Sequence, residues 1–221
     1  VVVPVNPTNR AEELKNYITD PDTKVAITTG DLAAEWVHAS DALPPAERLA
    51  HLVVTQFTDA FEANVSGDDA PPPAWADWLG TRHPLPALQQ GQAHAWSDAI
   101  ACTSEPPALA VGPQDLALLP YTSGTTGLPK GCMHPHKSIM HNAVASALWG
   151  AGSADNVTLA VVPMFHITGM VSVMHASIYS AATIVIMPRW DRDLAGRLIS
   201  RWQVTNWTNI PTMVIDLLAS P

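Results

Sequence analysis

The sequence predicts an α/β fold in which largely parallel sheets are flanked by helices. The chain has 221 residues, of which 47% are hydrophobic and 14% charged, so it can bury a substantial core. Strand-like and helix-like patterns alternate along most of the chain, and the helical candidates of roughly 10 to 13 residues are typical of connections between parallel strands. Two cysteines are too few for a disulfide scaffold, and the composition excludes a disordered or collagen-like chain.

Residues 1–58 show the strand–helix rhythm of the first βα units of such a fold. Asn9 and Glu12 have the spacing of a helix-capping box, and the apolar residues that follow share one helical face. In chain order, the extended and helical candidates are residues 1–5, 9–18, 24–28, 31–38 and 52–56. The pattern predicts βαβ connectivity in this part of the chain.

Residues 59–114 interrupt this rhythm and are predicted to form a loop-rich insertion. The segment contains three consecutive prolines and has short helical candidates only at residues 75–79 and 93–101. Its tryptophans, Trp75, Trp78 and Trp96, are expected to cover a surface, and we assign them no function.

Regular alternation returns over residues 115–221. The predicted strands cover residues 116–121, 131–136, 157–164, 183–188 and 204–210. The predicted helices cover residues 138–149, 169–181 and 193–202, with a further helix from residue 211. This part of the chain therefore predicts most of the parallel sheet.

The charge of the chain is uneven and argues against nucleic acid as a partner. Residues 1–120 carry 16 acidic and 5 basic side chains, whereas residues 121–221 carry 4 acidic and 6 basic ones. Residues 121–221 are therefore the more favourable part of the chain for an anionic ligand. The sequence has no basic stripe that could bind nucleic acid.

Several features of the sequence bear on where the protein is found. Cys102 and Cys132 form no CxxC pair, which favours the reducing cytoplasm. The apolar stretches fall short of the about 20 residues that a membrane span requires, so no integral membrane span is expected. The chain begins at Val1 with no basic segment ahead of an apolar one, which is unlike a signal peptide and suggests an excised piece.

Residues 121–131 form the most informative segment, because three glycines, four hydroxyl residues and a lysine follow one another between two predicted strands. Glycines let the backbone approach a ligand, hydroxyls and amides donate hydrogen bonds to phosphate oxygens, and a lysine compensates the phosphate charge. The segment is not a Walker A loop, since Pro129 stands where that pattern requires glycine. The candidate phosphate-binding residues are Thr122, Ser123, Gly124, Thr125, Thr126, Gly127 and Lys130. A plain hydroxyl-rich hairpin is the alternative interpretation.

A second candidate is His166, at the predicted end of a strand and just before a helix. Ligands of open α/β sheets bind at the carboxyl ends of the strands, which makes His166 a candidate site residue. The alternative is a hydrogen-bonded histidine that ends a strand. The methionines that surround it have either an apolar-pocket or a plain core role: Met164, Met170 and Met174.

Cys132, His134 and His136 alternate along a predicted strand and could therefore share one face. Zinc is conceivable from these residue types, but the spacing matches no usual structural site. Solvent-facing or packed histidines are the alternative.

Residues 122–131 resemble the signature loop of the adenylate-forming enzymes, a family that includes acyl-CoA synthetases, firefly-type luciferases and the adenylation domains of peptide synthetases. Residues 3–7 and 12–14 also resemble the first large-domain βα unit of acyl-CoA synthetases, and residues 163–166 match the Pro-x-Phe-His segment of these synthetases and of luciferases. Members of the family are more than twice as long. The resemblance therefore implies that residues 1–221 are part of the large N-terminal domain and that the mobile C-terminal domain is absent.

The resemblance implies a two-step reaction with ATP, Mg²⁺ and coenzyme A. A carboxylate attacks the α-phosphate of ATP, and coenzyme A then takes the acyl group from the adenylate. By resemblance, residues 122–127 would surround the triphosphate, Thr125 would help to hold Mg²⁺, and Lys130 would lie near the β- and γ-phosphates. His166 would line the acyl channel, and it favours a carboxylic acid without an amino group, which we expect to be a fatty acid.

Two alternatives to a fatty-acid–CoA ligase stay open. One is an aryl- or coumarate-type CoA ligase, which shares the Pro-Met-Phe-His segment, and the other is a structural or nucleotide-binding module without catalysis. The family motifs that complete the adenylate site are expected beyond residue 221, so the chain alone is expected to be inactive. Apolar surface left uncovered in such a fragment would favour self-association, for example as a homodimer.

Overall fold

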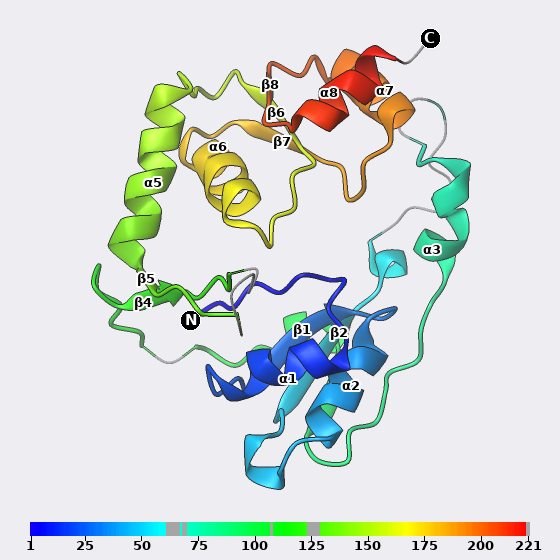
Figure 1. Ribbon diagram of the computed structural model, residues 1–221, viewed down its shortest axis with the longest axis vertical. Coiled ribbons are helices and arrows are strands. Elements are labelled where there is room, and N and C mark those ends of the chain that lie inside the picture. The colour runs from blue at the N-terminus through cyan, green and yellow to red at the C-terminus, as the bar shows by residue number, and fades with distance from the viewer. Residues whose placement is uncertain (61–66, 68–69, 107, 123–128, 220–221) are drawn as a thin grey trace. The chain divides into compact units, whose positions relative to one another are not determined.

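The computed structural model describes residues 1–60, 67, 70–106, 108–122 and 129–219. The chain forms two compact units, and each is described by itself (Figure 1). One unit comprises Asn6–Asn64 and Pro73–Leu109, and the other comprises Val1–Val5, Val65–Pro72 and Ala110–Pro221. Both contain parallel strands flanked by helices, which confirms the predicted α/β class.

The unit that contains Asn6–Asn64 has a three-stranded sheet in the order β1-β2-β3, and both strand pairs are parallel. The strands are β1 (Val25–Thr29), β2 (His51–Thr55) and β3 (Gln92–Ala95). The helices are α1 (Ala11–Thr19), α2 (Ala33–Asp41), η1 (Pro45–Glu47), η2 (Phe57–Asp59), η4 (Pro73–Trp75), α3 (Ala76–Gly80) and α4 (Trp96–Ile100). Figure 1 shows α1 and α2 over one face of β1 and β2.

A carboxylate of α2 holds the beginning of α1. Glu35 accepts a hydrogen bond from the Ala11 amide at 2.9 Å and another from Arg10 Nη1 at 3.1 Å. The Ala11 amide and the Arg10 side chain both favour the charged form, so the pKa of Glu35 lies below its ordinary value. The two helices are thereby joined at an end where the first amides of a helix need acceptors.

Strand β3 corrects the prediction of a helix over residues 93–101. Residues Gln92–Ala95 pair in parallel with β2, and the helix α4 begins only at Trp96. Gly91 precedes the strand with φ +92°, and a Cβ atom there would lie 2.5 Å from the Leu49 carbonyl oxygen. Only glycine fits this turn. Because β3 pairs with β2, part of the predicted loop-rich insertion belongs to the sheet.

The unit that contains Ala110–Pro221 has an antiparallel pair and a parallel sheet. Strands β4 (Leu116–Leu118) and β5 (His134–Pro135) form the antiparallel pair. The parallel sheet has the order β7-β6-β8, with β7 (Thr183–Ile186), β6 (Val157–Ala160) and β8 (Asn206–Trp207). The helices are α5 (His136–Trp149), the π-helix η5 (Thr168–His175), α6 (Ala176–Tyr179), α7 (Arg192–Trp202) and α8 (Pro211–Leu218).

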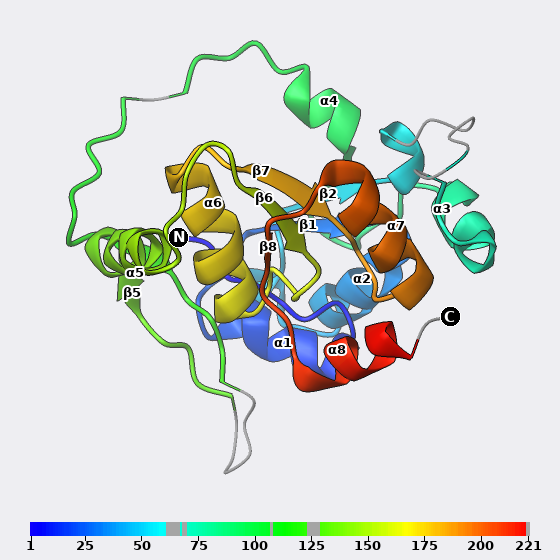
Figure 2. The same ribbon diagram turned by 90° about the horizontal axis from the view of Figure 1, so that it is seen from above.

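The order of this parallel sheet determines where its helices lie. The chain passes from β6 to its neighbour β7 through η5 and α6, and then returns past β6 to β8 through α7. Because such crossovers are right-handed, the two connections lie on opposite faces, and Figure 2 shows α6 and α7 on opposite sides of β6 and β7. The carboxyl ends of all three strands share one edge, where residues 161–167 leave β6.

Several elements are shorter than predicted. Pro120, Pro135 and Pro163 lie within or next to the predicted strands, and proline cannot donate to a strand ladder. Of residues 1–5 only Val2 makes a strand-like pair, with Leu118. The predicted helix over residues 169–181 is instead η5 followed by α6. Among the described residues, no helix has both the length and the apolar character needed to cross a membrane.

Candidate functional site

The ends of the predicted phosphate-binding loop are held together as a hairpin. Tyr121 and Gly131 form an antiparallel bridge, and the Thr122 amide donates to the Lys130 carbonyl at 3.0 Å. The Lys130 amide donates in return to Thr122 Oγ1 at 3.1 Å. Thr122 and Lys130 therefore lie side by side at the mouth of the loop. The other candidates lie outside the described residues: Ser123, Gly124, Thr125, Thr126 and Gly127.

Lys130 presents an uncompensated positive charge at this mouth. Its side chain is exposed, and among the described residues no carboxylate lies within ion-pair distance of it. A lysine in this state suits a multiply charged anion such as a polyphosphate. The loop base thus has the chemistry that phosphate binding requires.

The described residues contain no complete protein site for a metal ion. Within the described part of the chain, no group of three or more His, Cys, Asp or Glu side chains could hold a metal ion. Magnesium commonly takes one or two protein oxygens together with phosphate oxygens and water, so a site for it does not require such a group. The same finding gives no support to the zinc alternative at Cys132, His134 and His136.

The hairpin is anchored by the start of the chain and by a buried cluster. The Val2 amide donates to the Ala117 carbonyl, and the Leu119 amide donates to the Val2 carbonyl, both at 2.9 Å. Leu118 lies between them and is 4% exposed. It belongs to a cluster contributed by β4, α5 and η5: Leu118, Ile139, Ala143, Met170 and Val171.

His166 lies in the segment between β6 and η5, with an exposed side chain. Its amide donates to the Pro163 carbonyl and its carbonyl accepts from the Met170 amide, each at 3.0 Å. Its Nδ1 accepts a hydrogen bond from the Thr168 amide at 3.3 Å. In the neutral ring the proton is therefore on Nε2, which makes Nε2 a donor for a ligand oxygen.

Gly169 is a site residue that the sequence interpretation missed. A Cβ atom at this position would lie 2.6 Å from the Val162 carbonyl oxygen and closer still to that of Pro163. Only glycine lets η5 begin against the backbone that leaves β6. The signal available in the sequence was a glycine three residues after His166, where a helix start and a strand end must meet. The π-helical geometry of η5 is itself frequent at functional sites.

Two of the three methionines near His166 are core residues. Met170 is 8% exposed within the buried cluster, and Met174 packs against that cluster. Met164 is half-buried. The structure therefore supports the core role for Met170 and Met174, and the cluster joins η5, which follows His166, to β4, which precedes the hairpin.

Comparisons with known proteins agree with this geometry. The family model described as AMP-binding enzyme matches residues 1–221. The chain is 36% identical to 4-coumarate–CoA ligase 2 of Oryza sativa subsp. japonica over 120 residues, which cover 52% of this chain and 21% of that protein. The chain thus spans about a fifth of the length of this curated relative.

Solved structures show the same fold. The luciferase-like enzyme of the mealworm Zophobas morio matches with a TM-score of 0.71 at 16% identity, covering 100% of this chain and 44% of that one. A fatty acyl CoA synthetase of Mycobacterium tuberculosis matches with a TM-score of 0.67 at 22% identity, covering 100% and 36%.

Proposed function

Because the chain belongs to the AMP-binding enzyme family, we propose that the protein that carries it is an ATP-dependent ligase that joins a carboxylic acid to coenzyme A. The carboxylate oxygen attacks the α-phosphorus of ATP and pyrophosphate leaves. The thiol of coenzyme A then attacks the acyl carbonyl carbon, and AMP leaves. The observation that carries the proposal is that Lys130 lies beside Thr122 at the base of the glycine- and hydroxyl-rich loop, with no ion-pair partner among the residues that the structure describes.

In this proposal the hairpin holds the phosphates and neutralises their charge. The paired backbones of Thr122 and Lys130 keep the mouth of the loop in one geometry before the nucleotide binds. The Lys130 ammonium stabilises the negative charge that grows on the leaving pyrophosphate, an interaction stronger in the transition state than in the ground state. Magnesium would add charge neutralisation at the phosphates, with Thr125 as its proposed protein ligand.

His166 is proposed to act on the acyl side of the reaction. Its ring is oriented by the Thr168 amide, which leaves Nε2–H free to donate to an oxygen of the adenylate region. The apolar helix η5 follows directly, so an apolar acyl group could extend along this segment. His166 is thus a binding and orienting group in the acyl channel.

We propose a fatty acid as the substrate class, because the Pro-Met-Phe-His segment carries no acidic residue that could pair with an amino group. An aromatic acid is the second candidate, since the curated relative is called a 4-coumarate–CoA ligase. We place the protein in the cytoplasm, where its free and exposed cysteines would stay reduced.

The test is isotope exchange between ATP and pyrophosphate in the protein that carries this chain, with a panel of aliphatic and aromatic acids. Lys130→Ala is expected to slow the exchange by about 100-fold or more while the KM for the acid changes by less than about threefold. The control is Lys15→Ala, because Lys15 already pairs with Glu12 at 2.7 Å. The absence of any acid-dependent exchange would overturn the proposal in favour of a module without catalysis. Full exchange activity of Lys130→Ala would instead remove Lys130 from the proposed phosphate site.

A further inference from the structure

Gly131 follows Lys130 directly, and its backbone conformation does not require glycine. Its φ lies outside the left-handed range in which glycine is favoured. The space beside it is what excludes a side chain, because a Cβ atom at Gly131 would lie 2.7 Å from Leu119 Cδ2 and 3.2 Å from Tyr121 Cζ. The side chains of Leu119 and Tyr121 therefore occupy the place that a side chain at position 131 would fill.

Leu119, Tyr121 and Gly131 lie on one face of the hairpin, which we call the ring face. The backbones of Tyr121 and Gly131 form a bridge, and the next pair toward the loop is Thr122 with Lys130. Directly paired residues share a face, whereas successive residues of a strand point to opposite faces. Thr122 and Lys130 therefore lie on the face opposite the ring face.

The hairpin is held by packing on both of its faces. Leu118 alternates onto the same face as Thr122, and it is buried in the cluster shared with α5 and η5. On the ring face, Tyr121 packs against Gly131. Contacts on two opposite faces restrain the strand from twisting about its own axis, so they also restrain the direction of the Lys130 side chain.

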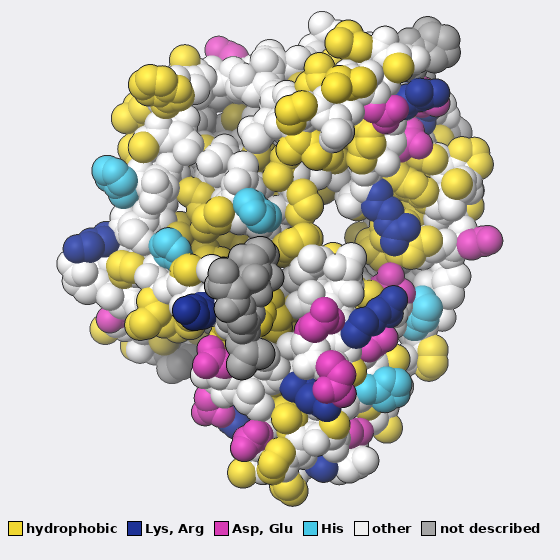
Figure 3. Space-filling model, in the orientation of Figure 1, with side chains coloured by type: hydrophobic (Ala, Val, Ile, Leu, Met, Phe, Trp, Pro, Cys, Tyr) yellow, Lys and Arg dark blue, Asp and Glu magenta, His cyan; other side chains and the backbone are white. Residues whose placement is uncertain are grey.

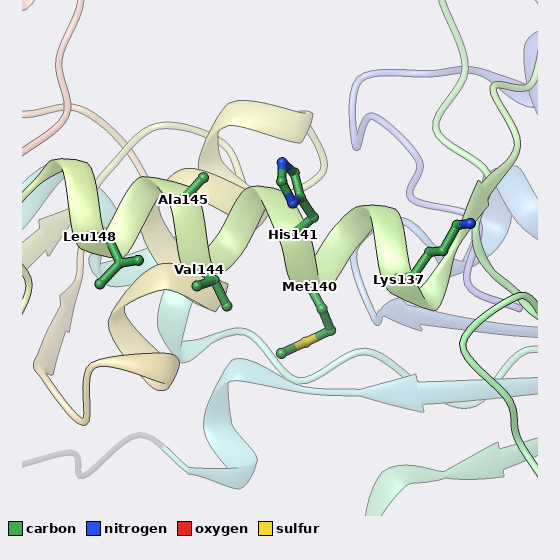
Figure 4. A pocket seen from close by; sticks show the side chains of 6 residues that line it. All are labelled: Lys137, Met140, His141, Val144, Ala145 and Leu148. Carbon is green, nitrogen blue, oxygen red and sulfur yellow. The ribbon is translucent and has the colours of Figure 1, made fainter.

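The direction of Lys130 matters because few cations surround it in the sequence. Lys130 and Lys137 are the only lysines or arginines in residues 121–188. Lys137 belongs to the first turn of α5, where it lines an open hollow of about 360 Å³ formed by that one helix (Figure 4). Among the described residues on the face that Figure 3 shows, lysine and arginine side chains are spread out and form no dense cluster. The positive charge at the loop therefore depends on the position of one side chain.

We propose that Tyr121 is a positioning residue of the phosphate-binding loop. Its ring, packed on Gly131, keeps Lys130 on the face of the hairpin that carries Thr122, so that the cation is in place before the nucleotide binds. This inference rests on the proposed ligase function and adds to it a residue that acts through Lys130. Because ATP binds only to molecules whose loop has this arrangement, a smaller population of the arrangement raises the KM for ATP by the same factor.

The first test measures ATP–pyrophosphate exchange in the protein that carries this chain. Tyr121→Ala removes the ring and is expected to raise the KM for ATP by about tenfold, while the KM for the acid changes by less than about threefold. Tyr121→Phe keeps the ring and should restore the parent value. Tyr179→Ala is the matched control and should leave both constants unchanged, because Tyr179 is 52% exposed in α6. Urea denaturation confirms that the variants are folded.

Two outcomes of this test would overturn the inference. One is an unchanged KM for ATP in Tyr121→Ala while Lys130→Ala slows the exchange, and the proposed function would then stand without the positioning role. The other is a Tyr121→Phe variant as impaired as Tyr121→Ala, which would assign the effect to the hydroxyl. Absence of acid-dependent exchange in the parent would remove the proposed function and this inference with it.

The second test adds a side chain to the ring face instead of removing one. Gly131→Ala is expected to lower kcat/KM for ATP by about tenfold or more, because the new methyl group displaces Leu119 and Tyr121. When both of these residues are already alanine, the same change should cost less than about threefold. Gly80→Ala is the control, since no described neighbour would lie within 4 Å of its Cβ atom. An equal cost of Gly131→Ala in both backgrounds would show that packing on the ring face does not position Lys130.

Discussion

Leu118 and Met170 pack in one buried cluster, so the hairpin that carries Lys130 and the helix that follows His166 share a core. Leu118 lies in β4 shortly before the loop, and the Met170 amide also bonds to the His166 carbonyl. Apolar packing therefore positions the proposed phosphate and acyl parts of the site relative to each other. A substitution in this core should change the rate of the reaction.

Leu118→Ala is expected to lower the free energy of unfolding by about 2 to 5 kcal/mol, because it leaves a cavity where the side chain is 4% exposed. Urea denaturation measures this. ATP–pyrophosphate exchange should fall as well, even under conditions where the variant is fully folded. Met170→Leu keeps the volume and should cost less than about 1.5 kcal/mol. A Leu118→Ala protein with normal exchange would show that the core does not position the site.

The sequence predicts only part of this site, because some of its residues are neighbours in the sequence whereas others meet only in the folded chain. The residue types that bind phosphate follow one another within 121–131, so the loop can be recognised locally. The pairing of Val2 with Leu118 and the role of Gly169 depend on segments far apart in the chain or on close backbone contacts. Such contacts leave no periodic signal.

The strands of the fold also divide into those that the sequence predicts and those that it does not. The parallel strands β1, β2, β6 and β7 were predictable from their apolar runs and from the helices between them. Strand β3 was not predictable, because Gln92–Ala95 consists of two alanines and two polar residues. These residues form a strand only because they pair with β2. Pro120, Pro135 and Pro163 limit β4, β5 and β6, a local effect that the sequence could have predicted.

Thr122→Val is expected to loosen the mouth of the loop. The variant keeps the shape of the side chain but removes the oxygen that accepts the Lys130 amide at 3.1 Å. The loss of one such bond at an exposed site costs about 0.5 to 1.5 kcal/mol. The KM for ATP should rise, whereas Thr122→Ser, which keeps the hydroxyl, should behave like the parent. Equal behaviour of the two variants would contradict the role of Thr122 Oγ1.

Gly169→Ala is expected to displace the segment that carries His166, because the new Cβ atom meets the Val162 and Pro163 carbonyl oxygens. Stability and acid-dependent exchange should both fall, by more than about 1 kcal/mol for stability. Gly196→Ala in α7 is the matched control, since the nearest atom to its Cβ is Leu217 Cδ1 at 4.0 Å. That variant should be neutral or up to about 1 kcal/mol more stable. Similar losses in both variants would mean that steric contact is not the cause.

The stability of the protein should fall in mildly acidic solution, in part through His175. Burial lowers the pKa of His175, so the unfolded chain takes up this proton more readily than the folded one. The contribution is present above the ordinary histidine pKa of about 6.5 and is lost as the pH falls through the lower folded value. His175→Gln should therefore show a smaller drop in urea midpoint between about pH 7.5 and about pH 5.5 than the parent does. An identical drop would show that other groups account for it.

His166→Asn and His166→Gln should separate the two nitrogens of this ring. Asparagine can keep an acceptor near the position of Nδ1, which bonds to the Thr168 amide at 3.3 Å, whereas glutamine places its amide donor near Nε2. If Nε2–H contacts the acyl–adenylate region, His166→Gln should retain about tenfold more kcat/KM than His166→Asn, and the acid preference of His166→Asn should change. Urea denaturation should rank the two in the opposite order, because asparagine preserves the local bond. A higher kcat/KM for His166→Asn would assign His166 a positioning role through Thr168 and remove it from the acyl channel.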